Sequence, residues 1–186
     1  MIEITSLWAP IVVSAIVVFA VSSIIHMGPF WHRNNFPKLA NEAQFMDAVR
    51  PLGLAPGDYT VPKPANMAEM KTPEFVEKAN KGPVILMTVM PNGAMTMGAS
   101  LLQWFIYSLV IGVLTAYITG HALDRGAPYL RVFQVAGATA FVSYAAALWP
   151  LSIWYRRGWH LTLKGTLDGL IYGLFTAGTF GWLWPR

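Results

Sequence analysis

Asp168 is the residue whose type and position most strongly suggest chemistry. It lies about five residues, or about 8 Å of helical rise, inside an apolar segment that runs from about Leu163 to Trp184. A carboxylate deep in a bilayer costs about 2.5–3.5 kcal/mol on insertion scales, so such groups usually face water or a partner. One interpretation is an ion or proton site formed with its polar neighbours Lys164, Tyr172 and Thr176. The other is a structural ion pair with one of the cations Lys164, Arg131, Arg156 and Arg157.

Histidine is the second residue type that could do chemistry. Neutral imidazole binds transition metals and haem iron, and three histidines, His26, His32 and His160, are expected on one side of the membrane. His26 and His32 are separated by Gly28-Pro29 and are not four residues apart on one helix. The spacing therefore enforces no metal site, and we predict no cofactor. A haem or metal ion held by His26 and His160 stays open as an alternative.

Two short segments mix aromatic and basic side chains, and both are expected at the same membrane surface. Tryptophan favours the headgroup layer, and arginine binds phosphate through charge-assisted hydrogen bonds. These segments predict contacts with anionic lipid headgroups through Trp31, Arg33, Trp154, Arg156, Arg157 and Trp159. Nucleic acid is not expected as a partner, because the 13 basic residues are few and dispersed.

Familiar catalytic patterns are missing from the sequence. It has no Ser-His-Asp arrangement, no phosphate-binding glycine loop, no HExxH helix and no paired carboxylates. It also has no cysteine, which excludes a disulfide scaffold, a thiolate nucleophile and a Cys-ligated metal site. These absences favour a role other than that of an enzyme.

The composition around these residues is that of an integral membrane protein. Of 186 residues, 55% are hydrophobic and 12% are charged, against roughly 45–50% and about 25% in soluble domains. A span needs about 20 mostly apolar residues. Four segments qualify, at about 7–25, 98–119, 129–155 and 163–184. We therefore predict an all-α membrane protein with four transmembrane helices in a small bundle, forming a single membrane domain over 1–186.

A long loop at about 26–97 separates the first two predicted spans. Its pattern indicates short helices at about 41–50 and 66–81, the second opened by Asn66 and Glu69 in the spacing of a capping box. The apolar stretch 84–97 is interrupted by Pro91-Asn92-Gly93. It fits a β-hairpin around that turn, an interfacial segment or a backward extension of the second span.

Small residues recur every four positions along the fourth predicted span. The stripe consists of Gly165, Gly169, Gly173, Ala177 and Gly181. Such spacing lets a second helix approach closely. Either the third span supplies the partner face, through small residues that include Ala136 and Ala140, or the stripe joins copies of the chain.

Charge near the spans predicts the orientation. More Lys and Arg flank the side that holds 26–97 than the side that holds both termini. The positive-inside rule then places this loop in the cytoplasm and both termini outside. The expected location is the inner membrane of a bacterium.

Three functional hypotheses follow. The first is a non-enzymatic scaffold, a homo-oligomer or an accessory subunit of a larger membrane complex, with bound anionic lipid. The second is a small channel or proton-coupled transporter that uses Asp168 and the polar face of the fourth span. The third is an interfacial enzyme or cofactor protein that uses His26, His32 or His160.

Overall fold

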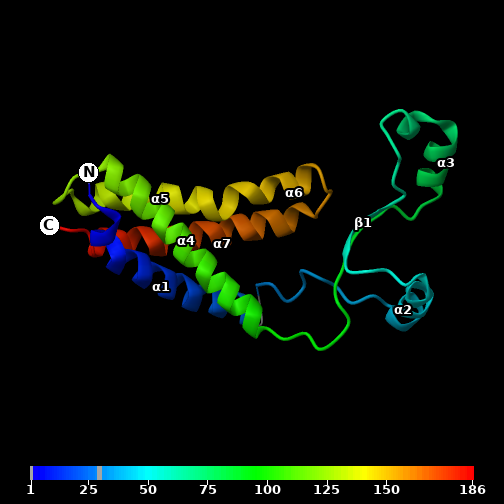
Figure 1. The fold of residues 1–186 in the computed structure, drawn as a ribbon, viewed down its shortest axis with the longest axis horizontal. Helices are drawn as coiled ribbons and strands as arrows, with labels where there is room; N and C mark the ends of the chain where they lie inside the picture. The colour runs from blue at the N-terminus through cyan, green and yellow to red at the C-terminus, as the bar shows by residue number, and fades with distance from the viewer. Residues whose placement is uncertain (1, 29–30) are drawn as a thin grey trace. The chain divides into compact units, whose positions relative to one another are not determined.

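The computed structural model describes residues 2–28 and 31–186, and it divides into two compact units. The larger unit combines Met1–Phe36 with Thr96–Arg186, and the smaller is Pro37–Met95. The larger unit holds the long helices and every residue of the candidate site described below. Figure 1 shows the order of the elements along the chain.

The larger unit is built from long helices. A 3₁₀ turn at Ile4–Leu7 leads into α1 (Trp8–Met27), and α4 spans Gly98–Ala122. Helix α5 (Tyr129–Ala145) continues through a 3₁₀ turn into α6 (Trp149–Ile153), and α7 spans Trp159–Trp182. Helix α1 packs on α4 and α7, and α5 packs on the same two helices. This arrangement brings the end of α1 close to the first half of α7.

Three of these helical segments are long and apolar enough to cross a membrane, namely Ile4–Met27, Gly98–Ala122 and Tyr129–Ile153. Most of their surface is exposed in the isolated chain, as expected for helices that face lipid. The chain is therefore mostly helical, with three helices that have the length and composition of membrane spans. Helix α7 has 24 residues but is not among the three segments, and it carries Lys164 and Asp168 in its first half.

Helices α5 and α7 approach each other through small residues. A Cβ atom added to Gly173 would lie 3.1 Å from the backbone nitrogen of Phe141, and one added to Gly169 would lie 2.9 Å from the Cβ of Ala145. Gly137 of α5 faces Ala177 in the same way. Gly165 and Gly181 face side chains of the segment that contains α5, Leu148 and Tyr129. The small-residue stripe of α7 thus faces α5 within one chain.

An apolar cluster closes the end of this unit where the two chain ends lie (Figure 1). Leu7, Val132, Ala136 and Phe180 are fully buried there, and Ile2 and Trp184 pack with them. The Trp184 indole also donates a hydrogen bond to the Asp124 carbonyl, at 3.1 Å. Ala140, in the middle of α5, is fully buried as well.

The smaller unit contains short elements. They are α2 (Glu42–Val49), a 3₁₀ turn (Arg50–Leu52), β1 (Gly57–Val61), a 3₁₀ turn (Glu69–Lys71), α3 (Pro73–Lys81) and β2 (Ile85–Val89). The strands pair antiparallel, with Tyr59 opposite Met87. The fold is therefore not purely helical, which corrects the all-α prediction for this unit.

Two expectations for the loop are wrong. The helix expected at 66–81 begins only at Pro73, because the residue before a proline is pushed out of the helical region, and Thr72 has φ −70° and ψ 145°. One capping-box contact forms, with the Asn66 carboxamide accepting from the Glu69 N–H, but it closes only a turn, and the Glu69 carboxylate accepts from the Ala65 N–H instead of that of Asn66. The hairpin around Pro91 is also wrong, since Ile85–Val89 pairs with the earlier strand Gly57–Val61. Helix α4 begins at Gly98, where the second span was predicted to start.

Candidate functional site

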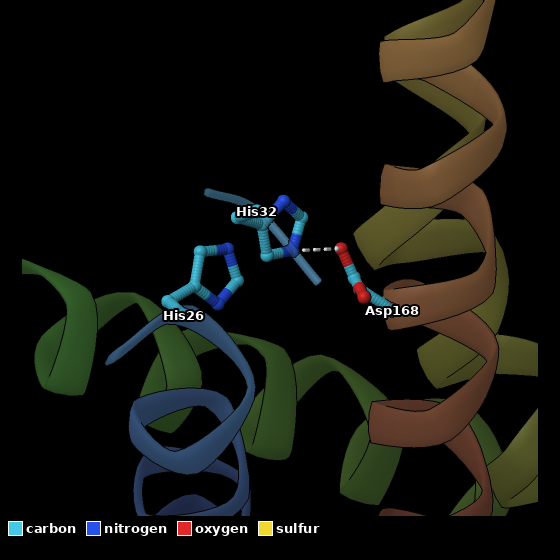
Figure 2. A group of neighbouring side chains, drawn as sticks. All are labelled: His26, His32 and Asp168. Atoms are coloured by element: carbon cyan, nitrogen blue, oxygen red, sulfur yellow. Dashed lines mark ion pairs between the residues drawn. The ribbon is translucent and has the colours of Figure 1, made fainter. Parts of the chain in front are cut away.

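Three titratable side chains from distant parts of the sequence meet in the larger unit. His26 lies in the last turn of α1, His32 in the segment that follows, and Asp168 in the first half of α7. One ligand atom from each, two ring nitrogens and a carboxylate oxygen, lie within 4.8 Å of one another. Figure 2 shows the two rings next to each other, with the carboxylate of Asp168 opposite a ring nitrogen of His32. We call this group the His26–His32–Asp168 cluster.

Asp168 is only 3% exposed, so the partners of its carboxylate decide what it can do. The Trp31 indole N–H donates to Oδ1 at 2.8 Å. The second oxygen, Oδ2, lies 3.0 Å from Nε2 of His32. A neutral donor therefore holds one oxygen, and the other faces a histidine.

The predicted structural pair between Asp168 and a nearby cation is wrong within the described residues. The Lys164 ammonium instead donates to the Trp31 carbonyl at 2.7 Å and to Oδ1 of Asn35 at 3.3 Å. The physical reason is that the segment after α1 folds against α7. The Trp31 carbonyl and the Asn35 amide of this segment accept from the Lys164 ammonium, and the Trp31 indole donates to the Asp168 carboxylate.

His32 presents a buried nitrogen whose hydrogen-bonding capacity is unused. Nε2 is buried and lies 3.0 Å from Oδ2 of Asp168, but the direction of its N–H does not make a hydrogen bond with that oxygen. The other ring nitrogen, Nδ1, lies 2.7 Å from the Asn35 amide nitrogen. Burial lowers the pKa of His32 below its usual 6.5, the nearby His26 and Lys164 lower it further, and Asp168 opposes them. The lowered pKa favours the neutral imidazole.

His26 is held in one tautomer by its own helix. Its Nδ1 lies 3.0 Å from the Ser22 carbonyl, which can only accept, so Nδ1 carries the proton. The Tyr172 hydroxyl lies 3.4 Å from the same nitrogen. The lone pair of Nε2 is then free. The ring stacks on His32 with 4.3 Å between centroids and 15° between planes.

A polar cavity of about 310 Å³ opens beside the cluster. Its lining includes the three cluster residues together with Asn35 and Arg157. The Arg157 side chain is exposed, and no ion pair is recorded for it in residues 2–28 and 31–186. This cavity gives a small polar molecule access to the cluster.

The other residues singled out from the sequence have varied positions. Tyr172 joins the cluster through His26, whereas Thr176 is buried one turn further along α7. His160, which sequence reasoning paired with His26, is exposed and is not in the cluster. The Trp31 indole N–H is used by Asp168, so it is not free for a lipid headgroup. The rest of the predicted headgroup set is exposed: Arg33, Trp154, Arg156, Arg157 and Trp159.

Sequence reasoning missed the contacts of Trp31, His32 and Asn35 with α7. The only local signal was the density of aromatic and polar side chains just after the first span. No spacing rule links that segment to Asp168, far along the chain. Comparison with protein-family models, with curated proteins and with solved structures finds no match, so the function is argued from the cluster itself.

Proposed function

We propose that this chain is a membrane protein, with α7 as a fourth span, that binds a divalent transition-metal ion through His26, His32 and Asp168. The supporting observation is the convergence of two imidazoles and a buried carboxylate within 4.8 Å. Two histidines and one carboxylate are a ligand set that Zn²⁺ and Fe²⁺ accept, with coordination positions left open. Helix α7 has 24 residues, more than the roughly 20 that a span needs.

The contact between His32 and Asp168 supports this assignment. Two ligand atoms at right angles around a six-coordinate ion such as Fe²⁺, each about 2.1 Å away, lie about 3.0 Å apart, and a tetrahedral Zn²⁺ site separates them to about 3.4 Å. His32 Nε2 and Asp168 Oδ2 are 3.0 Å apart. Because Nε2 of His32 makes no hydrogen bond within the part of the chain that the structure describes, the same separation would suit two ligands of a common ion. A 180° turn of the Asn35 side-chain amide would place its oxygen against Nδ1 of His32. Nδ1 would then carry the proton and donate to that oxygen, and Nε2 would keep its lone pair for a metal ion.

Neighbouring residues provide the support that metal ligands usually need. A ligating histidine commonly donates its second N–H to a carbonyl or carboxylate, which fixes its orientation. The Ser22 carbonyl does this for His26, and Asn35 is placed to do it for His32. Trp31 holds the Asp168 oxygen that would remain unbound. Because the His26 ring is stacked on His32, it must tilt before its Nε2 lone pair can point at the same ion as the other two ligands.

The expected chemistry is that of a metal centre reached through the polar cavity. The three ligands carry one negative charge, so a divalent ion leaves a net positive site. Such an ion would polarise a bound water or a substrate oxygen. The lowered pKa of His32 favours metal binding, since a protonated ring has no lone pair to give.

A proton relay along the same residues is the second candidate function. The observation that favours it is the row of neighbouring titratable groups, a hydroxyl, two stacked imidazoles and a carboxylate, from Tyr172 to Asp168. A scaffold that joins copies through α7 has less support, because the small residues already face α5 within one chain. In either case the charge bias of the sequence places loop 26–97 in the cytoplasm.

The test is metal content of the full-length chain, purified through a tag without histidines and exchanged into lipid nanodiscs. Elemental analysis should find about one equivalent of Zn²⁺ or Fe²⁺ per chain after equilibration. His26→Gln and His32→Gln should each lose it, while the matched controls His160→Gln and His121→Gln should keep it. A folded chain that binds no more metal than the double variant at His26 and His32 would overturn the assignment. Proton uptake by that metal-free chain, lost in Asp168→Asn, would then support the relay.

A further inference from the structure

A second cavity, of about 300 Å³, lies between α1 and α4 and shares His26 with the polar cavity. Its walls come from the last turns of α1 and the first turns of α4. The lining includes His26, Met27, Met97, Leu101 and Trp104. Both helices belong to segments apolar enough to span a membrane, so this cavity is placed to be filled from the lipid phase.

Two of the three serine hydroxyls in the wall of this cavity are already used within the chain, and the third belongs to Ser100 of α4. Ser22 donates to the Phe19 carbonyl at 3.0 Å and accepts from the Trp104 indole at 2.7 Å. Ser23 donates to the same carbonyl at 2.8 Å. Apart from Ser100 and His26, the lining is apolar or has its polar groups bonded, so the cavity suits a hydrocarbon chain.

The neighbouring polar cavity has the opposite character. Arg157 lines it and makes no ion pair within residues 2–28 and 31–186. Asp168 also lines it, but its carboxylate is already in contact with the Trp31 indole and His32. The unpaired guanidinium is complementary to an anionic group.

We propose that the cluster acts on, or is gated by, a single-chain amphiphile with an anionic head, such as a long-chain carboxylate. The hydrocarbon chain lies between α1 and α4, the head lies near Arg157, and His26 stands where the two cavities meet. The contact between the head and the ion rests on the proposed metal site. The placement of the chain and the role of Arg157 do not.

Cavity size argues for one chain. A volume of about 300 Å³ is at the lower end of the roughly 300–1,000 Å³ range of small-ligand sites. A two-chain phospholipid would leave one chain outside. The competing occupants are therefore a bilayer phospholipid or a neutral apolar molecule, and both are distinguished by the choice of probe.

The experiment measures binding of radiolabelled palmitate to the full chain in phosphatidylcholine nanodiscs, with hexadecyl phosphate, hexadecanol and phosphatidic acid as competitors. The two anionic single-chain probes should compete, and hexadecanol should be at least about tenfold weaker, since an unmet cationic site discriminates by about that factor or more. Equal competition by hexadecanol would show that the ligand needs no anionic head. Stronger competition by phosphatidic acid would show that the site prefers a lipid with two chains.

Variants locate each part of the amphiphile. Ser100→Phe, which fills the cavity from α4, should weaken palmitate binding about tenfold or more, and Ala99→Phe on the adjacent position outside the lining should not. Ser23→Leu fills the opposite wall and serves if Ser100→Phe lowers the yield. Arg157→Gln should weaken palmitate but not hexadecanol, and Arg156→Gln is its matched control. No difference within these pairs would overturn the inference.

Failure of this inference can be separated from failure of the metal site. If the chain binds no metal but binds palmitate, and Ser100→Phe weakens that binding, the amphiphile site is supported and the metal site is not. If the chain binds one metal ion but no palmitate, the metal site is supported and the amphiphile site is not. If both are right, chelation of the metal should lower the affinity for palmitate while the effect of Ser100→Phe persists.

Discussion

The two ends of the helical unit are stabilised in different ways. At the end with the chain termini, apolar side chains such as Leu7, Val132 and Phe180 are fully buried against one another. At the other end, Asp168 is buried and His32 is half-buried, and two cavities open beside them. Buried charge and empty volume both cost stability. A protein tolerates them where they serve a function, so the comparison favours the second end as the candidate site.

The close packing of α5 on α7 should give the largest effect when it is disrupted. Gly173→Leu places a branched side chain where even a Cβ would lie 3.1 Å from the Phe141 backbone. The helices must separate, which should cost about 3 kcal/mol or more, the upper range for overpacked cores. Thermal unfolding in detergent measures it. Gly98→Leu is the control, because nothing lies within 4 Å of a Cβ there, and equal loss in both variants would contradict the packing argument.

Asp168→Asn should lower metal affinity at the end with the cavities and leave the stability of the helical unit nearly unchanged. Asparagine keeps an oxygen for the Trp31 indole, which holds Oδ1 at 2.8 Å, and removes the charge. We expect near-normal unfolding and a loss of metal affinity of about 100-fold or more, since even supporting residues are worth about 10–100-fold. Titration with Zn²⁺ against a competing chelator gives the number. Unchanged affinity would remove Asp168 from the ligand set.

Asn35→Ala tests the supporting residue of His32. The amide nitrogen lies 2.7 Å from Nδ1 of His32, so its loss should leave the ring poorly oriented. Metal affinity should fall about tenfold, the lower range for such partners. Asn34→Ala is the matched control, because Asn34 is exposed and does not line the polar cavity. If both variants bind metal equally, Asn35 has no orienting role.

The smallest expected effect is a pH dependence of stability that comes from His32. Burial lowers its pKa in the folded chain below the usual 6.5, so between the two values the unfolded chain binds more protons. Its contribution to stability is therefore fully present above about pH 6.5 and is lost as the pH falls through this window. Unfolding midpoints of the metal-free chain should decline there, and less so in His32→Gln. An identical decline in both would assign the effect elsewhere.

Local patterns in the sequence were sufficient for the long helices. Apolar runs gave the start of α4 at Gly98 and the extents of the other apolar helices, because a helix is determined by neighbours within four residues. The spacing of the small residues at Gly169 and Gly173 also predicted a face for close packing. The same patterns did not give the pairing of β1 with β2, since strand partners are chosen across the chain.

Only the tertiary structure decided the site. The sequence singled out Asp168 by the cost of burying a charge, and it named His26 and His32 by residue type. For the structural interpretation it offered Lys164, which lies four residues away on the same helix, and Arg131, Arg156 and Arg157 as partners of Asp168. The fold instead brings the segment after α1 against α7. Trp31 and His32 then contact Asp168, and Asn35 accepts a hydrogen bond from Lys164. Such contacts depend on how whole helices pack, and that is set by the summed burial of many side chains and not by the spacing of any two residues.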